Sequence, residues 1–232
     1  VVWNGQWFKW ENRNTNFLYG GPDGGPTHDA PQNGYLNRSR VSLDYIPRDN
    51  NHPYRPAIIF RMAEAYLSYA EALNECSERM SYEQEILNNL NKIRHRAGIA
   101  EYGTGTDENG FTRIKINFAD QKEVRRLIHK ERRVEFVGEG IRYHDLRRWK
   151  TAHYGIGNMN EQGENPDWGV NGPDHGMNYY GTEYTDQGDN AFFKRTKYMD
   201  RVYPRKFYWY PIHQSEIDKD PTLVQGPFWL GE

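Results

Sequence analysis

Apolar side chains recur at helical spacing in the middle of the chain. From Pro56 onward they stand three or four positions apart, so a helix would carry them on one face. Pro56 itself suits the first turn of a helix, where its missing N–H is no loss. The pattern predicts a helix that starts near Pro56. Its expected buried stripe is Ile59, Met62, Ala63, Tyr66, Ala70 and Leu73.

A second helix is predicted to follow after a short connection. Ser81 stands three residues before Gln84, which is the spacing of a capping box at a helix start. Gly98 lies where a glycine commonly ends a helix. Two helices joined so closely should pack as a hairpin, and the pair over 56–98 has about the length of one tetratricopeptide repeat. The expected stripe of the second helix is Ile86, Leu87, Leu90 and Ile93.

Residues 120–150 are predicted to form another helix pair. A long helix begins at about Asp120, and Gly138 and Gly140 should break it. The expected buried side of the long helix is Val124, Leu127, Ile128, Val134 and Val137. The short helix that follows carries Asp145, Leu146 and Trp149.

The flanking segments lack helical periodicity. Residues 1–53 and the loop region 151–205 are rich in Gly, Asn and Asp, and a turn cluster occupies 20–26. Alternation at 41–46 and an aromatic run at 206–212 predict short strands. The chain is therefore predicted to be mainly α, with tetratricopeptide-like helix pairs, long irregular loops and a few short strands.

Composition excludes several classes of protein. The longest wholly apolar stretches are about four residues, as in 57–60, which is too short to cross a bilayer. Net charge is −2, so nothing suggests nucleic acid as a partner. The single cysteine, Cys76, cannot form an intrachain disulfide. Tyr, Phe and Trp number 17, 10 and 7, so large rings supply much of the apolar surface.

Glutamates and arginines alternate most densely between Glu131 and Trp149. Glu131 and Glu135 are four apart and share a helical face, which Glu139 continues. One interpretation makes Glu135 and Asp145 the acid pair of a glycoside hydrolase. The preferred interpretation is a structural network of arginine–carboxylate pairs. Each acid has a basic neighbour at helical spacing, whereas a catalytic acid needs a raised pKa.

The sequence predicts no bound metal ion and no cofactor. The eight histidines include no pair at the i, i+4 spacing of a helical metal site. Neither a nucleophile elbow nor a phosphate-binding glycine loop is present in the sequence. The run Asp-Glu-Asn-Gly at 107–110 lacks the full ligand set of a calcium-binding hand. We interpret it as an ordinary turn, with a structural calcium ion as the alternative.

Aromatic residues in the two loop regions are the candidate ligand contacts. Three tryptophans fall within eight residues near the start of the chain, in a stretch without core periodicity. Flat rings stack on the C–H faces of sugars, while amides and carboxylates bond the hydroxyls. The alternative is that these rings pack their loops onto the helices. The candidates are Trp3, Trp7, Trp10 and Tyr19 in the first loop region, and Trp168, Tyr179 and Tyr180 in the second.

Several motifs over residues 54–232 resemble the SusD/RagB family. They include Arg61-Met62-Ala63-Glu64-Ala65-Tyr66-Leu67, Leu90-Asn91-Lys92-Ile93-Arg94-His95-Arg96-Ala97-Gly98, Glu139-Gly140-Ile141-Arg142-Tyr143-His144-Asp145-Leu146-Arg147-Arg148-Trp149 and Tyr210-Pro211-Ile212. The resemblance implies a SusD-like fold of tetratricopeptide-like helix pairs. On this basis we divide the chain into a loop-rich ligand-binding segment, 1–53, and a family C-terminal domain, 54–232.

The resemblance also implies a function. Family members are lipid-anchored proteins on the surface of the outer membrane of Bacteroidetes-type bacteria. They capture glycans, or in some cases peptides, without catalysis, and deliver them to a SusC-like TonB-dependent transporter. Whole members are about twice as long as this chain, which is therefore expected to be a C-terminal part. The lipid anchor is expected on N-terminal chain outside it.

Overall fold

The computed structural model describes residues 16–27, 30–35, 54, 57–155 and 169–230. It also describes the backbone of four two-residue strands, Val2–Trp3 (β1), Gln6–Trp7 (β2), Lys9–Trp10 (β3) and Arg13–Asn14 (β4). The chain divides into two compact units. Unit 1 comprises Val1–Arg38, Trp149–Asn160 and Asn165–Glu232, and unit 2 comprises Ser39–Arg148 and Glu161–Glu164.

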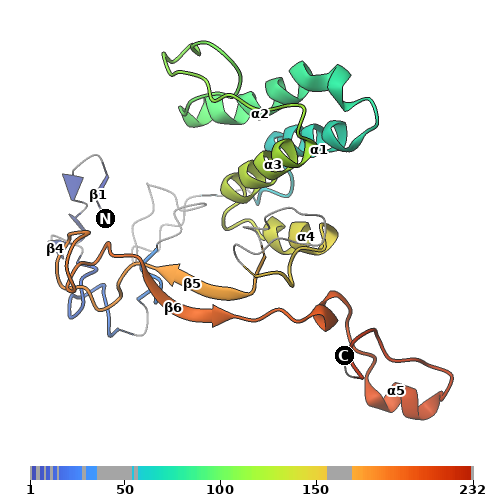
Figure 1. Cartoon of the computed structure of the whole chain (residues 1–232). Helices are drawn as coiled ribbons and strands as arrows, with labels where there is room; N and C mark the ends of the chain where they lie inside the picture. The colour runs from blue at the N-terminus through green and yellow to red at the C-terminus, as the bar shows by residue number, and fades with distance from the viewer. Residues whose placement is uncertain are drawn as a thin grey trace. The chain divides into compact units, whose positions relative to one another are not determined.

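The described part of unit 2 contains four α-helices (Figure 1). Side chains of three of them, α1, α2 and α3, form its apolar core. Helix α1 spans Met62–Glu75, α2 spans Glu83–Ala97, α3 spans Gln121–Glu135 and α4 spans Ile141–Arg148. Helix α1 packs against both α2 and α3. The fully buried core side chains include Leu67, Ile86, Leu90, Val124 and Ile128. The predicted mainly helical fold with helix pairs is confirmed.

Helix α1 begins later than the sequence pattern predicts. Its first residue is Met62, and Arg61 before it has an extended backbone with φ −142° and ψ 154°. Ile59, which we placed in the buried stripe, is 96% exposed, and Met62 is 58% exposed. Pro56 lies outside the described residues. Arg61 is held by tertiary contacts rather than by helical ones, because its guanidinium pairs with Glu135 and Glu139.

The predicted capping box of the second helix is absent. Ser81 lies within a 3₁₀ helix, Arg79–Tyr82 (η1), and α2 starts at Glu83 without a side-chain cap. The other end of α2 agrees with the prediction. Gly98 is left-handed at φ 67°, and its N–H donates to the last carbonyls of the helix.

Helix α3 begins as predicted, but its buried face is partly polar. The Asp120 side chain accepts hydrogen bonds from the backbone N–H groups of Lys122 and Glu123. Val124 and Ile128 are buried, whereas Val134 and Val137 are 63% and 66% exposed, so their assignment to the core was wrong. The predicted break after α3 is present, since Gly138 and Gly140 have φ values of 79° and 80°.

Unit 1 contains more turns than regular structure. Strand β5, Gly172–Gly176, pairs antiparallel with β6, Thr196–Arg201 (Figure 1). Strand β1 pairs with β2, and β3 with β4, also antiparallel. The predicted strand at 206–212 is wrong, because Arg205–Tyr208 forms a 3₁₀ helix (η2). A short helix, Gln214–Lys219 (α5), follows it. The predicted strand at 41–46 lies outside the described residues.

Candidate functional site

Three of the predicted aromatic contacts meet in unit 1. Tyr19 belongs to the first loop region, and Tyr179 and Tyr180 belong to the second. The ring centroids of Tyr19 and Tyr180 are 5.4 Å apart, those of Tyr179 and Tyr180 are 5.3 Å apart, and those of Tyr19 and Tyr179 are 6.4 Å apart. We call these three residues the tyrosine cluster.

The loop that carries Tyr19 is fixed by backbone hydrogen bonds. The Tyr19 N–H donates to the carbonyl of Gly181, directly after the other two tyrosines, over 2.9 Å. The Asp23 carboxylate accepts a hydrogen bond from the Asn16 N–H over 2.9 Å, which closes the loop. A β-carbon on Gly25 would lie 2.6 Å from the Tyr179 ring, so glycine is needed for this close approach.

Asn178 holds the other two tyrosines in place. It is 9% exposed, and its amide nitrogen donates to the carbonyls of Asp189 and Ala191 over 3.1 and 3.2 Å. Its side-chain oxygen accepts the N–H of Tyr180 over 3.2 Å. This buried carboxamide therefore sets the backbone from which the Tyr180 ring projects.

Tyr184 joins the two loop regions, although no local sequence pattern distinguishes it from the other tyrosines. Its hydroxyl accepts the N–H of Phe17 over 2.9 Å and donates to the Asn16 carboxamide over 3.2 Å. Its ring packs edge-on against Phe192, with centroids 5.8 Å apart. More than 160 positions separate Tyr184 from the loop that it holds, so its role depends on tertiary contacts rather than on any local pattern.

Within the tyrosine cluster, Tyr180 presents the most surface. It is 68% exposed and Tyr19 is 39% exposed, whereas Tyr179 is half-buried. The ring planes of Tyr179 and Tyr180 meet at 88°, so the two rings are in edge-to-face contact and do not lie stacked on one another. A braced, exposed phenol ring offers both a stacking face and a hydroxyl to a ligand.

The four predicted tryptophans are placed only in part. Trp3, Trp7 and Trp10 lie in β1, β2 and β3, where Trp3 pairs with Gln6 and Trp7 with Val2. Their side chains lie outside what the structure describes. Trp168 lies outside the described residues altogether.

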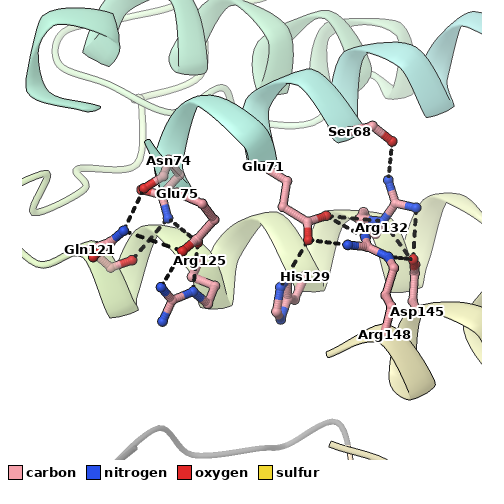
Figure 2. A network of polar contacts seen from close by, with 10 residues as sticks. All are labelled: Ser68, Glu71, Asn74, Glu75, Gln121, Arg125, His129, Arg132, Asp145 and Arg148. Atoms are coloured by element: carbon pink, nitrogen blue, oxygen red, sulfur yellow. Dashed lines mark hydrogen bonds and ion pairs between the residues drawn. The ribbon is translucent and has the colours of Figure 1, made fainter. Parts of the chain in front are cut away.

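The dense charge pattern of the sequence forms a structural network in unit 2. Figure 2 shows side chains of α1 and α3 facing one another along the length of their contact. Arg132, 3% exposed, pairs with Asp145 through Nε and Nη2, each over 2.9 Å. Arg148 donates to both oxygens of Glu71 over 2.5 Å, and its Nε donates to Asp145 over 2.9 Å. These guanidiniums tie α4 to both α1 and α3.

The same row of contacts continues toward the start of α3 (Figure 2). The Gln121 side chain donates to the carbonyl of Asn74 over 2.7 Å, and the Asn74 side chain donates back to the carbonyl of Gln121 over 3.3 Å. Arg125 pairs with Glu75 over 2.5 Å. Gln121 and Arg125 of α3 therefore bond directly to Asn74 and Glu75 of α1.

Glu131 and Glu135, which share a face of α3, are also ion-paired. Arg94 donates to Glu131 over 2.6 Å, and Arg96 donates to Glu135 over 2.6 Å. Burial alone would raise the pKa of Glu135, but hydrogen bonds from Arg96 and Arg61 outweigh it and hold that pKa below its ordinary value. A general acid needs the opposite shift. These contacts are those of a structural network of arginine–carboxylate pairs. They do not fit the acid pair of a glycoside hydrolase, which needs a carboxyl group with a raised pKa.

Residues 107–110 form a turn that is closed by hydrogen bonds from backbone N–H groups to the Asp107 side chain. The Asp107 carboxylate accepts backbone N–H groups of Glu101, Asn109 and Phe111 over 3.1, 3.0 and 2.9 Å. Burial opposes ionisation, but these three bonds hold the pKa of Asp107 below its ordinary value. In the part of the chain that the structure describes, no three His, Cys, Asp or Glu side chains gather as a metal site would require.

Among the described residues, no helix is both long and apolar enough to cross a membrane.

Comparison with known families identifies the class of protein to which this helical, loop-rich chain belongs. The model of the SusD family matches residues 3–229, almost the whole sequence. The chain belongs to the SusD family.

Two relatives are SusD-like proteins. The chain is 35% identical over 109 residues to SusD-like protein P25 of Formosa agariphila, an alignment that covers 47% of this chain and 18% of that protein. A solved SusD-like protein of Bacteroides fragilis is 28% identical, with a TM-score of 0.48 over 74% of this chain and 26% of the other. The chain thus spans about a fifth to a quarter of the length of these relatives.

Proposed function

We propose that the chain is part of a non-catalytic protein that captures glycans at the bacterial cell surface. The tyrosine cluster is the observation that carries this proposal. Sugars are bound by flat rings that stack on their C–H faces and by polar groups that bond their hydroxyls. Tyr180 supplies both, and its neighbours Tyr19 and Tyr179 hold its ring in place.

The proposal extends to delivery of the captured glycan. Family membership supports a place beside a SusC-like TonB-dependent transporter at the outer membrane, to which a lipid would anchor the protein. Neither role needs a catalytic group.

Substitution of Tyr180 tests the binding site. We expect Tyr180→Ala to weaken binding of a soluble polysaccharide by roughly 1–3 kcal/mol, by analogy with the stacking of a nucleobase on an aromatic ring. Affinity electrophoresis against a panel of starch, xylan, laminarin, mannan and pectin would identify a bound polysaccharide, and calorimetry would measure the change.

Tyr35→Ala is the matched control, because Tyr35 is a 55% exposed tyrosine of unit 1 outside the cluster. Its affinity should equal that of the wild type. Equal binding by wild type and Tyr180→Ala would show that the cluster is not the site.

The tryptophans of the first loop region are proposed as further stacking residues. Trp7→Ala and Trp10→Ala should each weaken binding of the same polysaccharide, and Trp3 and Trp168 can be tested in the same way. If the rings only pack the loop, these variants should lower stability while leaving the affinity of the folded protein unchanged.

A further inference from the structure

Asparagine followed by glycine occurs four times in the chain, at residues 4–5, 33–34, 109–110 and 171–172. This dipeptide permits a spontaneous reaction, in which the glycine nitrogen attacks the side-chain carbonyl carbon of the asparagine. Glycine favours the reaction because it has no β-carbon to obstruct the attack and its backbone turns freely. The asparagine side chain must also rotate onto the following nitrogen, so its contacts determine whether the reaction occurs. The last three of these pairs lie among the described residues.

Asn171 is held at both ends of its carboxamide. Its nitrogen donates to the carbonyls of His153 and Tyr203 over 2.6 and 3.2 Å, and its oxygen accepts the N–H of Tyr203. Gly172, which follows it, is the first residue of β5 and pairs with Arg201 of β6. The side chain cannot turn toward the Gly172 nitrogen unless these bonds open, so the structure protects this pair.

Asn33 is held by its own loop and by Met177. Its carboxamide oxygen accepts the N–H of Tyr35 over 3.1 Å, and its backbone carbonyl accepts the N–H of Met177 over 2.9 Å. A β-carbon on Gly34 would lie 2.7 Å from the Met177 β-carbon, so this glycine is closely packed. Reaction here would displace the loop from Met177.

Asn109 is exposed, as are Glu108 and Gly110 on either side of it. Within the part of the chain that the structure describes, its carboxamide has no hydrogen-bond partner. A β-carbon on Gly110 would meet no atom within 4 Å, so the space beside it is open. To react, the Gly110 nitrogen gives up one exposed turn bond, its 3.1 Å hydrogen bond to the Asp107 carbonyl.

We propose that Asn109 is a site of spontaneous covalent modification, at which the folded chain converts asparagine to aspartate and isoaspartate. The Gly110 nitrogen bonds to the side-chain carbonyl carbon (Cγ) of Asn109, and the bond from Cγ to the amide nitrogen breaks. That nitrogen leaves as ammonia with the proton of the Gly110 N–H, and a succinimide ring remains. Water then opens the ring. Opening at Cγ gives aspartate with the normal main chain, and opening at the backbone carbonyl gives isoaspartate.

The modification acts on the hydrogen bonds that close this turn. The Asp107 carboxylate, on a residue that is 7% exposed, accepts the N–H groups of Asn109 and Phe111 over 3.0 and 2.9 Å. Either product adds a negative charge close to this carboxylate, which it repels. Isoaspartate also inserts a methylene group into the main chain between the two donors. Modification should therefore loosen the loop over residues 101–118.

Peptide mapping of the whole folded chain, incubated at mildly alkaline pH, tests the proposal without any substitution. Trypsin places residues 33, 109 and 171 in separate peptides, and mass spectrometry follows conversion of the amide to the acid in each. We expect Asn109 to convert at least about tenfold faster than Asn171, whose side-chain hydrogen bonds must open first. Asn33 should also convert more slowly than Asn109. A protein isoaspartyl methyltransferase should methylate the isoaspartate formed at residue 109.

The same chain unfolded in urea is the matched control, because only the local sequence then affects each rate. The three pairs should convert at similar rates in urea. The variant Asn109→Gln should abolish conversion at this position, since the longer side chain does not form the succinimide ring. Conversion of Asn33 or Asn171 as fast as that of Asn109 in the folded chain, no conversion at Asn109, or an equal lead of Asn109 in urea would each overturn the proposal.

Discussion

At the scale of single residues, the buried guanidinium of Arg132 connects α3 to α1 and α4. Arg132 is 3% exposed, bonds Asp145 twice and donates to the Ser68 hydroxyl over 3.0 Å. Arg132→Ala removes the only cation among the described residues that bonds both oxygens of the buried Asp145 carboxylate, and leaves Arg148 as its remaining partner there. We expect this variant to lower the free energy of unfolding by about 3 kcal/mol, the lower end of the cost of breaking a buried ion pair, measured by urea titration with helix content followed by circular dichroism.

Arg125→Ala is the comparison that separates burial from charge. Arg125 lies on the same helix and pairs with Glu75, but the two side chains are 24% and 39% exposed. Solvent screens such a pair, so its loss should cost less than about 1 kcal/mol. Similar losses in the two variants would show that burial does not determine the strength of this network.

His129 should make stability depend on pH. Burial chiefly, with the nearby Arg148 and Arg125 charges, lowers its pKa from 6.5 to about 3. Between pH 6.5 and about pH 3, the His129 side chain is protonated in the unfolded chain but neutral in the folded protein. Stability from this residue is therefore complete above pH 6.5 and is lost as pH falls toward 3. From pH 6.5 to 5 the loss should be about 2 kcal/mol.

The measurement compares wild type with His129→Gln by urea titration at pH 7 and pH 5. Glutamine cannot take up a proton, so the variant should lose less stability than the wild type over this interval. Parallel losses in the two proteins would mean that His129 keeps a normal pKa in the folded state.

At the scale of elements, the ends of the helices provide a direct test of capping. The Asp120 side chain caps α3, whereas the Ser81 side chain caps no helix. We expect Asp120→Ala to lower the free energy of unfolding by about 1 kcal/mol and Ser81→Ala to leave it unchanged. Asp120→Asn should retain most of the stability, because asparagine also accepts the backbone bonds. A loss on Ser81→Ala equal to that on Asp120→Ala would contradict this assignment.

Helix identity was predictable from the sequence because apolar spacing and glycines are local signals. Gly98 and the pair Gly138 and Gly140 mark ends that the structure confirms. The errors arose where polar tertiary contacts replaced apolar ones. Glu131 and Arg132 occupy the buried face of α3 near its end, where the pattern favoured Val134. Their partners Arg94 and Asp145 lie on other helices, so a local pattern cannot show that they are buried.

At the scale of the whole molecule, the sequence could indicate which aromatic residues are candidates for the site. It could not indicate that three of them lie in contact with one another. Tyr19, Tyr179 and Tyr180 were selectable because they are aromatic and lie in loops rich in turn residues. Their contact depends on long-range bonds, such as that from the Tyr19 N–H to the Gly181 carbonyl.

The whole molecule should bind polysaccharide without cleaving it. Hydrolysis of a glycosidic bond needs one carboxyl group that stays protonated near neutral pH beside a second that is ionised. Glu131, Glu135 and Asp145 are each paired with arginine, and the pKa of Glu135 is lowered. We therefore expect no release of reducing ends when the purified chain is incubated with the polysaccharide that it binds. Release of reducing ends that Glu135→Gln abolishes, with circular dichroism showing that the variant is folded, would instead assign a catalytic role to Glu135.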